Sequence, residues 1–400
     1  MEHAYVYDAV RTPRGRGRPD GGLHEIAPVE LVATLTRELA ARHGLPADAI
    51  DDLLLGCVTQ VGDQGGNIAR VAALYAGLSS KVSGITLNRY CSSGLDACNF
   101  AAMKVMTGQD QLVLGGGVES MSRVAMLSDR GSFYTDPELI GAARFVPMGV
   151  AADLIAGLDA ISRQECDAYA VSSQPRAGRA RDEGRFRRSI VPVRQRGSGA
   201  IVSEDEIIRA GVTVEQLAGF EPAFGQAAAH YQAAFRQAFP GLPAYDPVHH
   251  KGNSPGVVDG ASLVLIGSAA AGSRLGLRPR ARIASMANAS GNELLALTGG
   301  IDAARKALGR AGMAFDDLDV IEFNEAFAAT SVKFLRDTGV DPELLNANGG
   351  AISLGHPMGA TGGMLVGMAL DELERRDGAI ALISVSGAAG SGTATVLERL

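Results

Sequence analysis

Two segments far apart in the chain share one layout, and this repeat limits the possible folds more than any other feature. The first is "YCSSGLDACNFAAMKVMTGQDQLVLGGG" (90–117) and the second is "GHPMGATGGMLVGMALDELERRDGAIALISVSGAAGSG" (355–392). Each passes from a polar turn into a helical stretch, then into an apolar strand, and ends on small residues. The pattern predicts a duplicated α/β unit whose two equivalent turns meet at a shared face.

Strands and helices alternate outside the repeat as well, which predicts a layered α/β architecture. Apolar runs typical of buried strands are Ala4–Tyr7, Asp52–Gly56, Gly84–Leu87, Gln111–Leu114, Ser262–Ile266, Ala281–Met286, Val320–Phe323 and Ala379–Val385. Helical spacing is found in Pro28–His43, Ile68–Ala76, Leu95–Thr107, Arg163–Arg181, Ile301–Ala311, Ala326–Asp337 and Ala360–Arg375.

The middle of the chain has a different character, with few strand-like runs and many arginines and glutamines. We interpret residues 121–256 as a loop domain that covers the active face and includes a helical insert at 225–250. Residues 1–120 with 257–271 then form the first half, and 272–400 form the second. The arginine-dense stretch 176–188 is interpreted as a solvated helix face rather than a phosphate clamp.

Charge and cysteine pattern argue against several classes of function. A formal net charge of −7 disfavours nucleic acid as the main partner, because phosphate contacts require a basic surface. The four cysteines form no CxxC pair and show no metal-like spacing with histidine. The first residues lack a secretory-signal layout, and we expect no apolar run near the roughly 18 residues of a membrane span. A soluble cytoplasmic protein without metal, nucleic-acid or membrane partners is therefore expected.

Cys91 is the first residue that could perform chemistry. It follows the strand-like "SGITLNRY" and precedes a helix that begins near Ser93. A helix N-terminus lowers the pKa of a cysteine thiol from about 8.5, and the small residues of "CSSG" leave room for an acyl group. Taken alone, the residue could equally be a buried structural cysteine. Cys98, two turns along the same helix, is interpreted as core.

His356 and Asn324 are the next candidates. His356 lies in a glycine-rich turn before a helix, the position equivalent to Cys91 in the other half, so it could take the thiol proton. Asn324 and Glu325 lie where a strand meets a helix; the amide could stabilise an oxyanion, and Glu325 could orient a partner. A helix cap is the alternative for this pair, and a surface or capping histidine for His356.

The glycine runs do not indicate a nucleotide site. Gly115–Gly117 and Gly387–Gly392 lack the lysine of a phosphate-binding loop and the full dinucleotide fingerprint.

A series of short motifs stands in a specific order along nearly the whole chain. They are "AVRTPRGR", "GGNIARVAALYAGL", "NRYCSSGLDA", "GGGVESMSR", "ISRQECDAYAVSSQ", "GNSPGVVDGAS", "EFNEAFA" and "NGGAISLGHPMGATGG". In this order they resemble the thiolase family, and the later part looks closest to bacterial degradative 3-ketoacyl-CoA thiolases.

The resemblance implies a fold and a reaction. The fold would have two similar βαβαβαββ halves in an α-β-α-β-α layering, with a loop domain inserted in the first. The reaction would cleave 3-ketoacyl-CoA with free coenzyme A to acetyl-CoA and a shortened acyl-CoA, or run the reverse Claisen condensation. Coenzyme A and acyl-CoA would be substrates, with no covalently bound cofactor.

The resemblance also implies the roles of single residues. Cys91 matches the acylated nucleophile, and His356 matches the histidine that activates it. Asn324 matches the residue that holds a water in a first oxyanion hole shared with His356. The amides of Cys91 and Ala388 would form the second oxyanion hole.

Further residues match contacts to coenzyme A and the acyl chain. Arg209 matches a contact to the nucleotide, and Met148 and Phe224 match residues that line the acyl and pantetheine tunnel. Pro255 stands where the family usually has a serine that hydrogen-bonds the pantetheine arm, and Ser254 beside it could compensate.

Ser386 is the main departure from the family pattern. It stands where the family has a second cysteine that transfers a proton to or from coenzyme A or the acyl donor. An aliphatic hydroxyl is far too weak an acid for that role, and losing one acid–base group typically costs about 10²–10⁴ in rate. On this alignment, Ser386→Cys is expected to raise thiolysis at least tenfold.

Three functions are therefore considered. The first is thiolase-like acyl transfer through acyl-Cys91, including transfer to another acceptor. The second is an impaired thiolase paralogue that binds acyl-CoA or serves as a partner subunit, and the third is a Cys–His hydrolase. The family implies a homodimer or tetramer, most simply an isologous dimer, and allows a hydratase–dehydrogenase partner.

Overall fold

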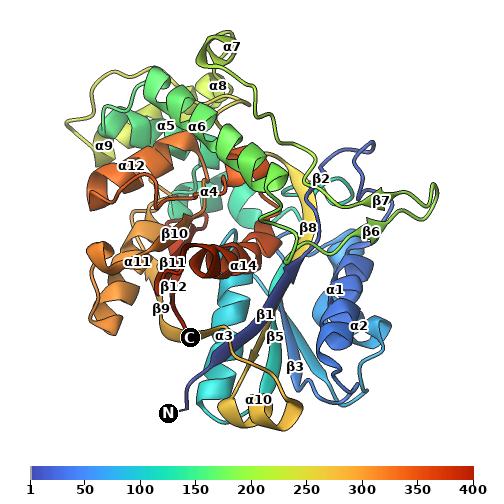
Figure 1. Cartoon of the computed structure of the whole chain (residues 1–400). Coiled ribbons are helices and arrows are strands. Elements are labelled where there is room, and N and C mark those ends of the chain that lie inside the picture. The colour runs from blue at the N-terminus through green and yellow to red at the C-terminus, as the bar shows by residue number, and fades with distance from the viewer. Residues whose placement is uncertain (1) are drawn as a thin grey trace.

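Ten strands form one mixed sheet in the computed structural model, which describes residues 2–400 (Figure 1). Along the sheet the order is β10-β11-β12-β9-β1-β8-β5-β3-β4, with β2 paired to β8. Their bounds are Val320–Phe323, Ile380–Ser386, Ser391–Arg399, Ala281–Ser290, Tyr5–Arg11, Val258–Gly267, Leu112–Ser120, Asp52–Gly56, Ser83–Leu87 and, for β2, Gly15–Arg16.

The sheet consists of two blocks with the same internal pattern. In the first block β3 runs parallel to β5, and β5, β8 and β1 follow as antiparallel neighbours. In the second, β10 runs parallel to β11, and β11, β12 and β9 follow as antiparallel neighbours. Even β4, parallel to β3, has a counterpart in the parallel bridge Ile321–Leu345. The predicted duplication is confirmed.

Two helices, α3 (Ser93–Met106) and α14 (Met358–Arg376), pack against each other between the two blocks. The blocks themselves are joined by β1 and β9, which pair at only two positions. Helices α1 (Pro28–His43) and α2 (Ile68–Ala76) cover the outer face of the first block. Helices α11 (Gly299–Ala311) and α12 (Ala328–Thr338) cover that of the second. The chain therefore has the α-β-α-β-α layering that the resemblance implied.

Glycines allow the two central helices to cross closely at their N-termini. A Cβ on Gly94 of α3 would lie 2.5 Å from the carbonyl oxygen of Gly359 on α14. A Cβ on Gly362 would lie 2.0 Å from the amide nitrogen of Leu95. Such distances exclude any side chain, so the helices meet backbone to backbone at the ends that carry the equivalent turns.

Residues 121–257 leave the sheet, and most of their helices gather above the central helices in Figure 1, while residues 193–202 extend to the right near β2. Their helices are α4 (Pro137–Ala143), α5 (Met148–Leu158), α6 (Arg163–Asp182), α7 (Val214–Ala218), α8 (Gly225–Ala228) and α9 (Gln232–Ala238), with a small hairpin of β6 (Val193–Arg194) and β7 (Ile201–Val202). The chain then re-enters the sheet as β8, between β1 and β5. The remaining short helices are α10 (Ala269–Leu275) and α13 (Ala351–Leu354).

Four predicted strands are longer in the structure, and one strand was missed. β1 continues to Arg11, β8 begins at Val258 and β9 continues to Ser290. β5 does not end at Leu114 but continues through Gly115–Gly117 to Ser120. Those glycines form a strand because Gly359 and Ser262 approach closely: a Cβ on Gly117 would be 1.9 Å from the Gly359 oxygen. β12, which lies buried in the sheet over most of its length, was not predicted as a strand at all.

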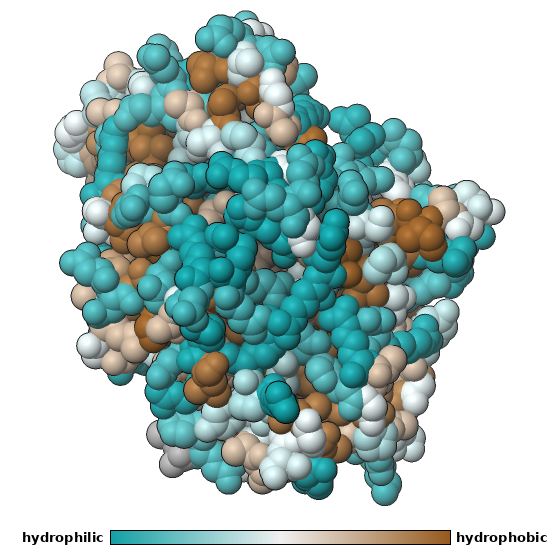
Figure 2. Space-filling model, in the orientation of Figure 1, coloured by the Kyte–Doolittle hydropathy of each residue, from teal (hydrophilic) through white to brown (hydrophobic). Residues whose placement is uncertain are grey.

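One apolar segment passes a membrane-span criterion, contrary to the expectation from the sequence. Residues Pro137–Leu158 are long and apolar enough, with a mean hydropathy of 1.6, but half of that stretch is buried inside the protein. It is also divided into α4 and α5 by Arg144–Pro147, where Arg144 is left-handed. Such a segment is weak evidence for a span. The face in Figure 2 is mainly hydrophilic, with scattered apolar patches.

Candidate active site

Cys91 and His356 occupy equivalent turns directly before the two central helices. Each residue precedes by three positions a glycine of the helix crossing: Gly94 follows Cys91, and Gly359 follows His356. Because these two glycines are in contact, the two turns lie on the same side of the crossing. The structure thus brings together the two turns that carry Cys91 and His356, which the repeat predicted would meet.

The Cys91 turn is held rigidly. Tyr90 has a left-handed backbone with φ of 50°, and Arg89 N donates to Ser93 Oγ at 2.8 Å. Ser92 Oγ donates to the carbonyl of Val385 at 2.8 Å, which fastens the turn to the end of β11. The Cys91 backbone therefore has little freedom, as a nucleophile that must meet a fixed carbonyl requires.

The Cys91 thiol is protonated at neutral pH, and the expectation of a lowered pKa is wrong. Burial, with the negative charge of Glu119 as a second cause, raises the pKa of Cys91 to about 12. The helix begins at Ser93 as expected, but at this buried position the loss of solvation outweighs the favourable field of its N-terminus. To attack as a thiolate, Cys91 must lose its proton to a base.

His356 can serve as that base. Its Nδ1 lies 2.7 Å from Thr361 Oγ1, which itself donates to the carbonyl of Pro357. Nδ1 therefore carries the proton, and the lone pair is on Nε2. That Nε2 atom is buried and has no hydrogen-bond partner within residues 2–400. Burial, aided by the charge of Arg14, lowers the pKa of His356 to about 4, so the ring is neutral at pH 7.

Asn324 offers a second buried polar group to a ligand. It follows β10, and its backbone N–H donates to the carbonyl of Ser384 at 2.9 Å. Both its side-chain oxygen and nitrogen are buried, without a hydrogen-bond partner in the described chain. A buried amide without a hydrogen-bond partner lowers the stability of the folded state by about 1–3 kcal/mol, so we expect a substrate or water to hydrogen-bond to it.

Glu325 holds the site together rather than facing substrate. Its carboxylate accepts from the amide of Ile352 at 2.9 Å, from Ser173 Oγ at 3.0 Å and from the Tyr169 hydroxyl at 3.0 Å. It thereby fixes the end of β10 to the turn before His356 and to α6. The sequence predicted that Glu325 could orient a partner, and these three contacts show that its partners are protein groups of α13 and α6.

Glu119 has a similar role that the sequence did not reveal. It is the last residue but one of β5 and is fully buried, and its carboxylate accepts from the amides of Val58, Thr59 and Gly359. The Gly359 contact, at 2.9 Å, fixes the start of α14 and thus the His356 turn. An acidic residue within an otherwise small and apolar strand was the one signal that could have marked it.

Ser386 faces away from these turns. Its hydroxyl oxygen accepts from the amide of Gly300 at 3.0 Å, at the start of α11. Strand alternation places Ser384 on the same side, where its hydroxyl donates to the Gly300 carbonyl, and places Val385 on the side of α3. The structure does not bring the Ser386 side chain together with Cys91 and His356.

Ala388 lies in the tight turn between β11 and β12. A Cβ on the neighbouring Gly387 would be 3.0 Å from the carbonyl oxygen of Arg89, so this turn packs against the residues that precede Cys91. The Ala388 carbonyl accepts from Ser391, and Ala388 itself is buried. The backbone of Ala388 is therefore near the Cys91 turn.

The four residues matched to coenzyme A and acyl contacts fall in two places. Met148 and Phe224 share an apolar cluster of the loop domain, where Phe224 covers Gly149 and packs edge-on against Phe327. Ser254 belongs to the segment whose Gly256 carbonyl accepts from the His356 amide, and its buried Oγ has no partner in the described residues. Arg209 is exposed, and its backbone amide donates to Gln174.

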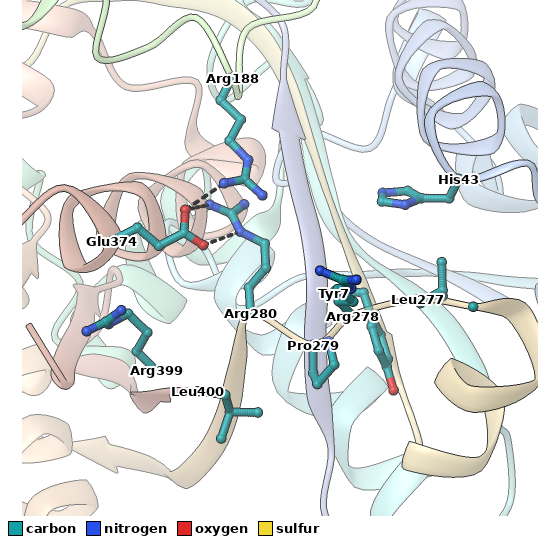
Figure 3. A pocket seen from close by; sticks show the side chains of 11 residues that line it. Tyr7, His43, Arg188, Leu277, Arg278, Pro279, Arg280, Glu374, Arg399 and Leu400 are labelled. Carbon is teal, nitrogen blue, oxygen red and sulfur yellow. Dashed lines mark hydrogen bonds and ion pairs between the residues drawn. The ribbon is translucent and has the colours of Figure 1, made fainter. Parts of the chain in front are cut away.

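A cavity of about 540 Å³ lies elsewhere and does not belong to this site (Figure 3). Glu374, one of its lining residues, stands near the C-terminal end of α14, roughly 27 Å along the helix from the His356 turn. Arg280 in this cavity is paired with Asp371 and Glu374, and Arg188 also pairs with Glu374. The charges of Arg280 and Arg188 are therefore already balanced by carboxylates.

No group of three or more histidine, cysteine or acidic side chains within residues 2–400 is arranged to hold a metal ion.

Comparisons with known proteins point to one family. The family model described as "Thiolase, N-terminal domain" matches residues 4–234, and "Thiolase, C-terminal domain" matches residues 277–399. A 3-oxoadipyl-CoA/3-oxo-5,6-dehydrosuberyl-CoA thiolase of Escherichia coli is 39% identical over 100% of both chains. A beta-ketoadipyl-CoA thiolase of Pseudomonas aeruginosa is 37% identical over 99% of both, and a 3-ketoacyl-CoA thiolase of Shigella boydii 37% over 100% of both.

Proposed function

This chain belongs to the thiolase family, and on that premise we propose that Cys91, His356 and Asn324 carry its reaction. The protein is an acyl-CoA acyltransferase that cleaves 3-ketoacyl-CoA with coenzyme A, or condenses two acyl-CoA molecules in reverse. It uses CoA-bound substrates without a metal or prosthetic group. The observation that carries the assignment is that the Cys91 and His356 turns meet at Gly94 and Gly359, while His356 Nε2 and the Asn324 amide are buried without a hydrogen-bond partner in residues 2–400.

Acylation begins with a proton transfer. Nε2 of His356 takes the proton from Cys91 Sγ, and the thiolate attacks the 3-keto carbon to form an S–C bond. The resulting oxyanion is stabilised by a water held by Asn324 and His356 or by the amides of Cys91 and Ala388. The bond between C2 and C3 then breaks, and the departing acetyl-CoA enolate takes the proton from His356.

Deacylation uses the same histidine. Nε2 of His356 accepts the thiol proton of coenzyme A, and the CoA sulfur attacks the acyl-Cys91 thioester. As the new thioester forms, Cys91 Sγ leaves and recovers the proton from His356. His356 thus serves as the base in both half-reactions. The Ser386 hydroxyl is hydrogen-bonded to the Gly300 amide and takes no part in either of them.

An intact-mass experiment tests this assignment. The protein is mixed with acetoacetyl-CoA or a longer 3-ketoacyl-CoA, with and without free coenzyme A, beside a Cys91→Ala control. We expect an acyl adduct on Cys91 that is released rapidly when coenzyme A is added. An adduct that persists with coenzyme A indicates another acceptor, and one lost to water alone indicates a hydrolase. The absence of any adduct would favour an impaired paralogue that only binds acyl-CoA.

For the acyl group, we propose an apolar chain. Met148 and Phe224 lie in a cluster with Leu294, Leu297 and Phe327, which suits an unbranched hydrocarbon. A second candidate is a chain ending in a carboxylate, because relatives named for 3-oxoadipyl-CoA and beta-ketoadipyl-CoA are 37–39% identical. The ratio of kcat/KM for 3-oxooctanoyl-CoA over 3-oxoadipyl-CoA decides between them; a ratio above one supports the apolar chain.

For nucleotide binding, we propose that exposed Arg209 contacts the phosphates of coenzyme A and that Ser254 donates to the pantetheine arm. The support is the unpartnered Ser254 hydroxyl on the segment bonded to the His356 turn. Arg209→Ala should raise KM for both coenzyme A and 3-ketoacyl-CoA, and should leave the rate of Cys91 acylation at saturating 3-ketoacyl-CoA unchanged.

We also propose a cytoplasmic homodimer. The support for dimerisation is an apolar edge: Ile85 on the edge strand β4 is 50% exposed, and Val71 of α2 and Phe100 of α3 are exposed as well. An unpaired apolar edge strand favours pairing with a second copy across a twofold axis. The cysteines of residues 2–400 are all free thiols, as suits a reducing compartment. A hydratase–dehydrogenase partner stays a further proposal from the family.

A further inference from the structure

Tyr90 immediately precedes the nucleophile, and the reaction described above does not use it. Its backbone is left-handed, with φ of 50°, a conformation that few large side chains adopt. The Tyr90 amide donates to Asn88 Oδ1 at 2.8 Å, and its carbonyl accepts from the Ser93 amide at 3.0 Å. These bonds hold the strained backbone, so the direction in which the tyrosine side chain leaves the chain is fixed.

The ring of Tyr90 begins a row of three aromatic side chains, Tyr90, Phe133 and Phe145. Tyr90 packs edge-on against Phe133, with ring centroids 6.1 Å apart, and Phe133 packs edge-on against Phe145 at 5.3 Å. Aromatic rings attract one another in this arrangement. A separate segment of the loop domain, residues 131–145, therefore holds the Tyr90 ring. All three residues are only half-buried, so part of the surface of this aromatic row stays open.

The aromatic row leads from the nucleophile to the apolar cluster of the loop domain. The last residue of the row is followed directly by Val146, which belongs to that cluster, and Met148 packs against it. Tyr90 also lies against the turn between β11 and β12, because a Cβ on Gly387 would be 3.4 Å from Tyr90 Cβ. An acyl group on Cys91 that extends into the cluster is therefore expected to pass along the row.

Charge on the Tyr90 ring does not decide which acyl chains can pass. Burial, followed by the nearby charge of Asp129, raises the pKa of the Tyr90 hydroxyl, so this group is neutral at pH 7. Asp129 itself accepts from the hydroxyl of Tyr134. The surface that the row offers to an acyl group is therefore aromatic and uncharged, and its selectivity depends on shape.

We propose that Tyr90 is a specificity-determining residue: its ring, held by Phe133, leaves room for an unbranched acyl chain and excludes a branch beside the carbonyl that Cys91 attacks. The inference rests on the proposed function, because it names the shape of the acyl group in that reaction. The carbon beside the attacked carbonyl is the first branch point that residue 90 can meet. A ring held by both its backbone and its edge yields little, and one extra carbon in an apolar pocket changes kcat/KM by about 10–200-fold.

The test compares two substrates that differ by one methyl group. Cys91 is acylated by 3-oxooctanoyl-CoA or by 4-methyl-3-oxooctanoyl-CoA, whose extra methyl lies beside the attacked carbonyl, and rapid quench with intact mass gives both rates. In the unsubstituted protein we expect the unbranched substrate to react at least tenfold faster. Tyr90→Ala should lower this ratio at least threefold, and Phe133→Ala, which removes the support of the ring, should lower it as well. Tyr90→Phe, which keeps the ring, is the matched control and should keep the ratio.

A methyl group also slows the attack itself, so the change in the ratio between variants is decisive. An unsubstituted ratio below tenfold, a fall of less than threefold in Tyr90→Ala, no fall in Phe133→Ala, or an equal fall in Tyr90→Phe overturns the proposal. A loss of stability alone would slow both substrates alike and leave the ratio unchanged. If Tyr90→Ala does not fold, Tyr90→Asn replaces it, because asparagine tolerates a left-handed backbone. Acylation by neither substrate contradicts the proposed function, whereas equal acylation by both contradicts only this inference.

Discussion

Unpartnered polar atoms mark the site at the scale of single residues. Within residues 2–400, His356 Nε2 and both side-chain polar atoms of Asn324 are buried without a hydrogen-bond partner, whereas most buried polar groups in native structures are paired. The sequence could identify both, together with Cys91, because each stands where a strand or turn meets a helix. It could not identify Glu119, since its role depends on a partner 240 residues away.

Ser386→Cys tests the orientation of that residue. Because the side chain at 386 faces the Gly300 amide, a thiol there should not reach Cys91, and thiolysis should stay within about threefold of the unsubstituted rate. Ser386→Ala is the matched control. Steady-state thiolysis of acetoacetyl-CoA is the measurement. A gain of tenfold, about 1.4 kcal/mol, would show that position 386 faces the reacting groups, as the alignment alone suggested.

Glu322→Leu should stabilise the protein, and more so at high pH. Below about pH 4.5 the carboxyl is protonated in both the folded and the unfolded state. As pH rises, the unfolded state releases the proton while the buried group retains it, so folding loses free energy. We expect a gain of about 1–3 kcal/mol at pH 8, and a smaller one at pH 4, from urea unfolding. An equal gain at both pH values would contradict a raised pKa.

At the scale of elements, the glycine crossing of α3 and α14 positions the two turns. The sequence predicted both helices to within two or three residues, because their alanine- and leucine-rich spacing is regular. It predicted β5 too short and missed β12, because glycines and small polar residues form these strands only where neighbouring backbone approaches closely. Such contacts are long-range and have no local signal.

Gly94→Ala tests the crossing. The added Cβ would lie 2.5 Å from the Gly359 carbonyl oxygen, so α3 and α14 must move apart. We expect a loss of about 1–3 kcal/mol in unfolding free energy and slower acylation of Cys91. Gly309→Ala on α11 is the control: its Cβ meets no atom within 4 Å, and it should stabilise by about 0.5–1 kcal/mol. A neutral Gly94→Ala would show that the turns do not depend on this contact.

At the scale of the whole molecule, two duplicated blocks and a loop domain build one site from distant parts of the chain. The duplication was predictable from the repeat, because both copies keep the order of turn, helix and strand. The path of residues 121–257 was not predictable from the sequence, because its helices are held by contacts between remote segments. Examples are Asp153 with His249 and Asp167 with His250.

Ile85→Lys tests the proposed dimer. A charge on the exposed face of β4 would oppose burial of that edge against a second copy, so the variant should sediment as a monomer in analytical ultracentrifugation. Ile201→Lys, at an exposed apolar residue of the small β6–β7 hairpin, is the matched control and should not change the mass. A dimer that survives Ile85→Lys places the interface elsewhere.

The proposed mechanism is tested most directly by the rate at which a 3-ketoacyl-CoA acylates Cys91, followed by rapid quench and intact mass. We expect a stoichiometric adduct in the unsubstituted protein, none in Cys91→Ala, and acylation slowed by about 10²–10⁴ in His356→Asn. An unchanged acylation rate in His356→Asn, or an adduct that maps to any residue other than Cys91, would contradict it.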